Sequence, residues 1–436
     1  MNALLTFLLL LTVLWLLAQG LSGREKLFQF PFLTGVITFS FILPQVPALI
    51  NDRFLPDGAF ARTVAFTILC LVMCRLGWSS RARPLSFLSW NFDYKKLLIV
   101  SYILSIAGAY FYFKLSRLPG DLTIGVQISG MPVVYLFIAR LMSYGLCIAI
   151  LCLARRVTWP ALLIIGFDLI FYLDRIVVTG KRAEAIELVG MFCLAFWFHR
   201  RWAPPRVLVL GGVLLGTLLM NSMGDYREIT RENSRPVWQE IGEIDVEKNL
   251  RTVLEEGGFE FRNAIMRIHH TNSTMEFDYG KFHWNRLVFS FVPSQFLGTE
   301  FKESLMLAVP ATARDYDPVT GTTETGMADA FQSFWYLGAL KFLILAYLMC
   351  RLWASAERGE MAGQLVYILS IVPAMHAVSH QTDWVLTVWV HMLIFLVPSL
   401  AFAIVPGSLR PDWRAAQAAS VMRSATDRKV SHEVPL

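Results

Sequence analysis

Cationic side chains occur at several points where an apolar segment of the chain ends. The short connection from Asp174 to Glu184 carries Arg175, Lys181 and Arg182 between two apolar stretches. Arginine binds phosphate oxygens through paired N–H donors, and lysine acts as a point charge. We therefore interpret these cations as a site for a phosphate or pyrophosphate group. Interfacial anchoring, with ion pairs to Asp174 and Glu184, is the alternative.

Two further arginines lie at the edges of a long polar stretch and favour the same chemistry. Arg227 follows the end of an apolar segment, and Arg286 precedes a short apolar run, residues 287–297, which we expect to dip into the outer leaflet. Lipid headgroups lie at this boundary between water and hydrocarbon. We predict that both arginines contact an anionic headgroup, although an isolated surface arginine is usually only solvated.

Acidic residues and histidines near the end of the polar stretch are candidates for a general base. Asp329 and Glu324 lie close to its end, and His380 lies near the outer end of a later apolar segment. A general base removes the proton from an attacking hydroxyl group. His376 and His380 are four residues apart, which also suits a metal, but no third ligand is evident and we predict no metal site.

Arg140 and Asp168 are ionisable residues well inside long apolar segments. Charged side chains in hydrocarbon are costly, and they usually pair with one another or line a cavity. The two residues lie on consecutive segments joined by a short turn. We expect a mutual ion pair, with a structural and a functional role equally compatible with the sequence.

The elements that must position these residues are predicted to be membrane-spanning helices. Of the 436 residues 55% are hydrophobic and 17% are charged, and the mean hydropathy is +0.51. A backbone in hydrocarbon must satisfy its hydrogen bonds within the segment, so long apolar runs without strand-like alternation predict helices. We expect an all-α polytopic membrane protein with about eleven transmembrane helices. The predicted spans lie near residues 3–19, 31–50, 60–78, 96–114, 131–154, 159–178, 184–199, 206–222, 330–353, 363–380 and 384–405.

The predicted organisation has four parts. Residues 1–221 hold about eight spans, residues 222–329 form a large loop with amphipathic surface helices, residues 330–405 hold about three spans, and residues 406–436 form a disordered tail. Short connections rich in Lys and Arg fall on one side under strict alternation, and that side should be cytoplasmic. The large loop then lies outside, and the tail is cytoplasmic.

Several classes of protein are excluded by what the sequence lacks. The six cysteines all fall in apolar runs, which argues against a disulfide framework or a cysteine-based metal site. The sequence contains no phosphate-binding loop, dinucleotide fingerprint, serine-hydrolase elbow or nucleic-acid pattern. We expect no ATP coupling, no cofactor and no nucleic-acid partner. The N-terminal apolar run lacks a basic leader region and is interpreted as a retained first helix.

Three stretches resemble one family of membrane enzymes. Residues 179–184, Thr-Gly-Lys-Arg-Ala-Glu, resemble the Gly-Ser-Arg-Gly-type signature of the oligosaccharide repeat-unit polymerases, the Wzy-type O-antigen and exopolysaccharide polymerases. Residues 285–298 are similar to the segment before that family's last large-loop turn. Residues 325–338 resemble the small-residue run, acidic residue and Phe-Gly-x-x-Gly that open the following span.

The resemblance implies a metal-independent glycosyltransferase at the periplasmic face of the bacterial inner membrane. The growing glycan would leave undecaprenyl pyrophosphate and join a new lipid-linked repeat unit, with a chain-length regulator and a flippase as expected partners. Cations would stabilise the leaving pyrophosphate, and one base would activate the acceptor hydroxyl. In this assignment the pyrophosphates contact Arg175, Lys181, Arg182, Arg227 and Arg286, and the base is Asp329, Glu324 or His380.

Two other functions remain open. An O-antigen ligase has a similar architecture and the same donor but transfers the glycan to lipid A-core. A membrane transporter or flippase of lipid-linked oligosaccharide belongs to a different class, whose members commonly contain paired repeats and broken helices. The sequence shows no internal repeat, which favours the enzymes.

Overall fold

The computed structural model describes the chain apart from residues 80, 119–130, 179, 233–237, 311–323 and 406–436. Its elements in the described part are helical, and extended backbone pairs only at an isolated bridge between Phe92 and Ile404. The prediction of an all-α chain is therefore confirmed. The tail predicted to be disordered lies outside the described residues.

Six helical segments of the described chain are long and apolar enough to cross a membrane. A seventh is possible if α9 (Arg206–Asn221) and the first part of α10 (Met223–Glu232), which are bent by 55° at their junction, form one span. The prediction of about eleven spans is therefore wrong. The six segments are α1 (Asn2–Leu21), α3 (Ala59–Leu76), α4 (Tyr94–Ser116), α5 with α6 (Met131–Ala139 and Leu141–Arg155), α17 with α18 (Gly326–Phe334 and Leu340–Glu357), and α20 with α21 (Asp383–His391 and Val397–Ala403).

Charge and length separate the other predicted spans from these six. Helix α7 (Trp159–Val177) contains two aspartates and an arginine, and α8 (Arg182–Arg200) contains two glutamates besides its terminal arginines. Such groups are costly in hydrocarbon. Helix α19 (Met361–Met375) has only 15 residues, and α2 (Phe30–Ile37) continues into π and 3-10 turns that end at Asn51. Helix α19 is buried almost throughout, whereas α7 and α8 bury one face against the bundle and leave the other partly exposed.

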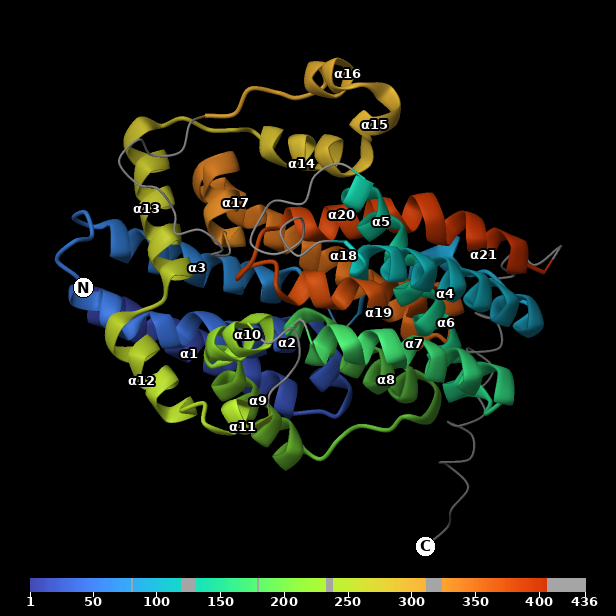
Figure 1. Ribbon diagram of the computed structural model, residues 1–436. Helices are drawn as coiled ribbons and strands as arrows, with labels where there is room; N and C mark the ends of the chain where they lie inside the picture. The colour runs from blue at the N-terminus through green and yellow to red at the C-terminus, as the bar shows by residue number, and fades with distance from the viewer. Residues whose placement is uncertain (80, 119–130, 179, 233–237, 311–323, 406–436) are drawn as a thin grey trace, which may run out of the picture.

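The helices lie side by side, and the described parts of residues 222–329, which we call the polar segment, lie around the left-hand part of the bundle and over its upper side (Figure 1). Helix α13 (Phe259–Thr274) stands across the ends of its neighbours and buries Phe261, Ala264, Ile265 and Ile268, an apolar face at helical spacing. Helices α14 (Lys281–Phe291), α15 (Ser294–Leu297) and α16 (Thr299–Ser304) extend above α17 and α20. Asn285 closes this unit by donating to and accepting from the backbone of Leu307. We call residues 281–307 the arm.

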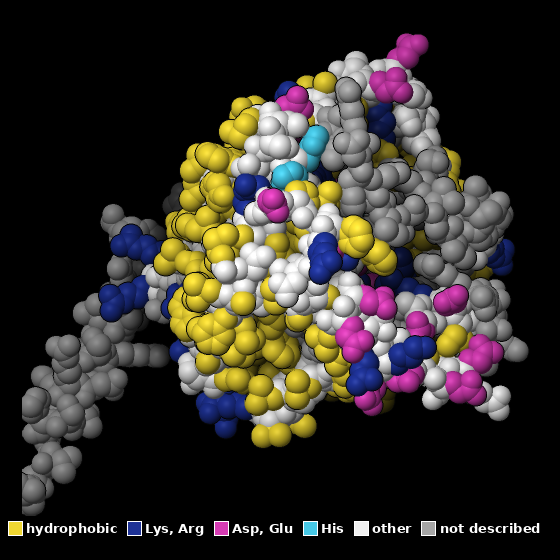
Figure 2. Space-filling view, turned by 90° about the vertical axis from the view of Figure 1, so that its left-hand side faces the viewer, with side chains coloured by type: hydrophobic (Ala, Val, Ile, Leu, Met, Phe, Trp, Pro, Cys, Tyr) yellow, Lys and Arg dark blue, Asp and Glu magenta, His cyan; other side chains and the backbone are white. Residues whose placement is uncertain are grey.

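Charged side chains are distributed unevenly around the bundle. Figure 2 shows hydrophobic side chains over the left of one face and charged side chains at its lower right. The predicted amphipathic segments form α11 (Trp238–Gly242) and α12 (Val246–Glu256). Arg262 of α13 pairs with Asp52 at 2.9 Å, so the connection after α2 meets the polar segment. Arg201 pairs with Glu357 between the ends of two other helices. The cytoplasmic side of the bundle stays a prediction.

Gly326 allows α17 to begin in contact with the turn that follows α19. A Cβ atom at this position would overlap the carbonyl oxygens of Ala377 and His380, and backbone atoms cannot move aside as a flexible side chain can. We expect Gly326→Ala to destabilise the protein by about 3 kcal/mol. A thermal unfolding curve of the purified protein should show the loss, whereas Gly190→Ala, made inside α8 where nothing lies within 4 Å of the added carbon, should not lower the midpoint. Equal midpoints for the two variants would contradict this packing argument.

Candidate functional site

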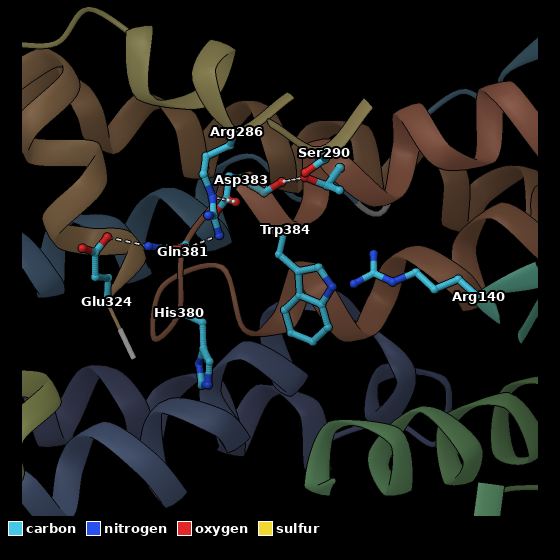
Figure 3. Close-up of a pocket in the computed structure, with 9 residues that line it drawn as sticks. Arg140, Arg286, Ser290, Glu324, His380, Gln381, Asp383 and Trp384 are labelled. Atoms are coloured by element: carbon cyan, nitrogen blue, oxygen red, sulfur yellow. Dashed lines mark hydrogen bonds and ion pairs between the residues drawn. The ribbon is translucent and has the colours of Figure 1, made fainter. Parts of the chain in front are cut away.

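A polar cavity of about 580 Å³ lies where the arm meets the bundle (Figure 3). Four of the residues that the sequence singles out, Arg140, Arg286, Glu324 and His380, come together in its wall. The full lining is Arg140, Arg286, Ser290, Glu324, His380, Gln381, Asp383, Trp384 and Thr387.

Three elements supply most of this wall. Helix α14 of the arm presents Arg286 and Ser290, which are four residues apart and so lie on one helical face. The turn between α19 and α20 contributes His380 and Gln381. The first two turns of α20 contribute Asp383, Trp384 and Thr387.

Arg140 enters the cavity from the side opposite Glu324 (Figure 3). It occupies the one-residue break between α5 and α6. The break frees the carbonyl oxygen of Phe137, and His391 Nε2 donates a hydrogen bond to that oxygen at 2.9 Å. A helix interruption inside a bundle is tolerated where a neighbour satisfies the freed backbone group in this way.

A continuous chain of polar contacts crosses the cavity wall. Arg286 Nε donates to Asp383 Oδ2 at 3.0 Å, and its Nη2 donates to Gln381 Oε1 at 3.4 Å. Gln381 donates to Glu324, and Glu324 is paired with Arg267 Nη1 at 2.7 Å. Burial by itself would raise the pKa of Glu324, but the charge of Arg267 and the hydrogen bonds from Arg267 and Gln381 outweigh it and lower the pKa. Glu324 is therefore ionised at neutral pH.

His380 is a neutral imidazole in the cavity wall. Its ring centroid lies 5.0 Å from that of Phe41 and 4.9 Å from that of His376, and its Nδ1 lies 2.9 Å from Ser379 Oγ. Burial, followed by the nearby His376 and Arg182, lowers the pKa of His380 well below its ordinary value. The side chain is thus unprotonated at neutral pH.

The other predicted phosphate-binding cations gather around Gly180, outside the cavity lining. Arg175 forms an ion pair with Glu184, and Arg227 Nε donates to the carbonyl oxygen of Gly180 at 3.3 Å. Lys181 immediately precedes α8. Gly180 has a φ of 61°, which a residue with a side chain rarely adopts. Thr179, the first residue of the motif, lies outside the described residues.

Phe41 connects this group of cations to the cavity. The guanidinium of Arg182 lies 5.2 Å from the Phe41 ring centroid, and the same ring packs against His380. Arg182 Nη1 also donates to the carbonyl oxygen of Met220 at 3.3 Å. The sequence-predicted cations therefore fall into two neighbouring groups, with Arg140 and Arg286 in the cavity and the rest beside it.

Asp329 and Asp168 lie elsewhere. Asp329 is 1% exposed, does not line the cavity, and accepts hydrogen bonds from the backbone and side chain of Thr382. Asp168 is buried on α7 and accepts a hydrogen bond from Ser105 of α4 at 2.7 Å. No ion pair joins Asp168 to Arg140, although the structure describes both residues, because Asp168 is bonded towards α4 while Arg140 lines the cavity.

An apolar cleft of about 400 Å³ adjoins the polar cavity, and Ser290 lines both. Val133, Phe137 and Phe395 of the bundle form one side. The arm forms the other with residues 289–296 and Lys302, whose Nζ donates to the carbonyl oxygen of Phe289 at 3.0 Å. The short apolar run at 287–297 was the sequence signal for this cleft. The bundle residues gave no sequence signal, because their apolar side chains are typical of any membrane-spanning segment.

Comparison with known proteins adds no relative, since no protein-family model, curated protein or solved structure matches the chain. The family resemblance of the three short stretches therefore stays a prediction. Within the described residues, no group of three or more His, Cys, Asp or Glu side chains is placed to hold a metal ion.

Proposed function

We propose that this chain is a membrane glycosyltransferase that moves a growing glycan from a polyprenyl pyrophosphate onto a new lipid-linked repeat unit. The observation that carries the proposal is the junction of a polar cavity with an apolar cleft at Ser290. A ligand that fits both has an anionic, sugar-bearing headgroup and a long hydrocarbon chain. Undecaprenyl pyrophosphate-linked oligosaccharide has this chemistry.

The cavity suits a pyrophosphate leaving group. Arg286 approaches from the arm and Arg140 from the bundle, so a headgroup between them meets guanidinium groups from two sides. Positive groups held in place before the reaction stabilise the negative charge that develops on the leaving oxygen. Asp383 pairs with Arg286 when no ligand is bound, and Glu324 pairs with Arg267 beside them.

His380 is the best of the three candidate bases. It lines the cavity with an unprotonated ring, whereas the Glu324 carboxylate is already engaged by Arg267 and Gln381, and Asp329 lies outside the cavity lining. The nearby negative charge of a bound pyrophosphate would raise the proton affinity of the imidazole. In the proposed step the acceptor oxygen bonds to the anomeric carbon, the bond from that carbon to the pyrophosphate breaks, and the hydroxyl proton passes to His380.

The membrane setting of the proposal is the bacterial inner membrane, with the polar segment in the periplasm and the C-terminus in the cytoplasm. Six apolar helices support membrane association. Arg351 Nε donates to the carbonyl oxygen of Arg83, and Arg201 pairs with Glu357, so these cation-rich connections meet at one end of the bundle. This supports the orientation, because short cytoplasmic loops carry the excess of Lys and Arg. A chain-length regulator and a flippase would act with the enzyme.

The decisive test is incubation of purified protein in lipid nanodiscs with a defined undecaprenyl pyrophosphate-linked repeat unit. We expect a ladder of longer lipid-linked glycans. Transfer to lipid A-core without a ladder would identify a ligase instead. Movement of the lipid-linked substrate across a proteoliposome membrane, with no new covalent product, would identify a transporter.

A further inference from the structure

A buried chain of hydrogen bonds lies directly behind the cavity wall. The carboxylate of Asp329 on α17 accepts the backbone N–H of Thr382 at 2.7 Å and the Thr382 hydroxyl at 2.9 Å. The same hydroxyl oxygen lies 2.6 Å from His283 Nε2 on α14. The chain thus joins α17, the residue that precedes α20, and the arm.

The positions of the protons in this chain follow from the chemistry of its members. A carboxylate only accepts hydrogen bonds, so the single hydroxyl proton of Thr382 points to Asp329. His283 Nε2 must then donate to the hydroxyl oxygen. Its buried Nδ1 has no hydrogen-bond partner among the described residues, which favours the neutral imidazole over the doubly protonated form. Lys341 Nζ, 3.5 Å from Asp329 Oδ1, balances the charge of the carboxylate. Burial and then Lys341 lower the pKa of His283 to about 4, in agreement with the neutral form.

Two parallel contacts therefore attach the arm to one short turn of the bundle. Thr382 lies between Gln381 and Asp383, and both of these neighbours accept hydrogen bonds from Arg286. His283 precedes Arg286 by three residues, about one helical turn along the same face of α14. A shift of the arm that broke the His283 contact would also move Arg286 relative to its acceptors.

We propose that Asp329, Thr382 and His283 are positioning residues that fix the register between the arm and the cavity wall. None of the three lines the cavity, so they act through Arg286 and the residues on either side of Thr382. The identity of the ligand that Arg286 meets rests on the proposed function. The positioning of the arm by these three residues does not depend on the proposed function. Experiments can therefore contradict the positioning role and the proposed function separately.

Matched substitutions at His283 test the proposal. His283→Leu removes the donor, whereas His283→Gln keeps an N–H group at about the reach of Nε2. Displacement of catalytic groups by about 1 Å can lower activity about 100-fold, so we expect His283→Leu to weaken binding of farnesyl pyrophosphate and to slow the ladder reaction by about 10- to 100-fold. His283→Gln should stay within about twofold of wild type. Thr382→Val and Thr382→Ser form a second pair with the same expected contrast.

Amide hydrogen exchange supplies a readout that does not depend on the reaction. Exchange in a peptide that covers residues 281–291 should rise in His283→Leu and Thr382→Val and should stay at the wild-type level in the two conservative variants. Unchanged exchange and unchanged binding in His283→Leu and Thr382→Val would overturn the proposal. In another outcome, wild type binds no pyrophosphate probe while exchange still rises in the two disruptive variants and not in the two conservative ones. That result would support the positioning role of the three residues and contradict the glycosyltransferase assignment.

Acidification should loosen the same contact. The folded-state pKa of His283 is about 4 against an ordinary value of 6.5, so the stabilisation by neutral His283 is complete above about pH 6.5 and is lost as the pH falls towards 4. Lys341 on α18 opposes protonation, whereas Asp383 on α20 and Asp278 before α14 favour it. Exchange in residues 281–291, corrected for the intrinsic rate, should therefore rise over this interval. His283→Gln, which has no group at this position that titrates in this interval, should show a flatter dependence of exchange on pH. An equally flat profile in wild type would contradict the role of His283 protonation.

Discussion

Arg286→Ala should slow glycan transfer at least about 100-fold and weaken pyrophosphate binding by a similar factor. Arg286 Nε donates to Asp383 Oδ2 at 3.0 Å, and the carboxylate side chain of Asp383 is only 8% exposed. Removal of the guanidinium takes away a contact to the leaving group and also leaves this carboxylate without its cation. Truncating one partner of a buried charge pair costs about 2–5 kcal/mol. Because the Arg286 side chain is 40% exposed, we expect the lower part of that range, about 3 kcal/mol, and each 1.4 kcal/mol corresponds to about a factor of ten.

Two controls separate the role of Arg286 from a general loss of charge. Arg286→Lys keeps the charge but loses the planar fork of donors, so we expect an intermediate loss of about tenfold. Arg251→Ala removes an arginine from an exposed i,i+4 pair with Glu255 on α12 and should leave the reaction unchanged. Rates of the ladder reaction and unfolding midpoints of all three variants provide the measurement. Transfer by Arg286→Ala within twofold of wild type would remove Arg286 from the site.

The helices were predictable from the sequence because their apolar runs are long. The number of helices that could span a membrane was not predictable in the same way. Counting apolar windows treats α7 and α8 like the other segments, although α7 contains Asp168 and α8 contains Glu184 and Glu187 within its first turns. Those groups find partners only in the folded bundle, where Asp168 meets Ser105 and Glu184 meets Arg175. The partners come from other helices, so the cost of each charge cannot be read from its own segment.

The candidate site was predictable in its residue types and only partly in its assembly. Arg286, Glu324 and His380 were identified because they flank the polar stretch or a span end, and the fold brings them into one cavity. Arg140 was paired with the wrong partner, because the order of two segments does not fix the rotation of either helix about its axis. Asp329 shows the same limit, since its position near the end of the polar stretch does not reveal that its side chain is buried against Thr382 outside the cavity lining.

Ser290→Trp should separate binding of the headgroup from binding of the hydrocarbon chain. Ser290 lines both the polar cavity and the apolar cleft, so an indole at this position would fill the junction between them. Burial of each CH₂ group contributes about 0.8 kcal/mol. Exclusion of only four chain carbons then costs about 3 kcal/mol, or roughly 100-fold in affinity. We expect this loss for undecaprenyl pyrophosphate and a change of less than about threefold for inorganic pyrophosphate.

The pattern across ligands, rather than the size of one loss, decides whether the cleft holds the chain. Ser290→Ala keeps the junction open and should bind both ligands like wild type. Glu303→Trp places the same indole on the exposed surface of α16 and controls for the added aromatic group. Equal loss of both ligands in Ser290→Trp would mean that the cavity itself is blocked. Wild-type binding of both would mean that the chain leaves the headgroup site by another route, and the cleft beside Ser290 would then have no part in substrate binding.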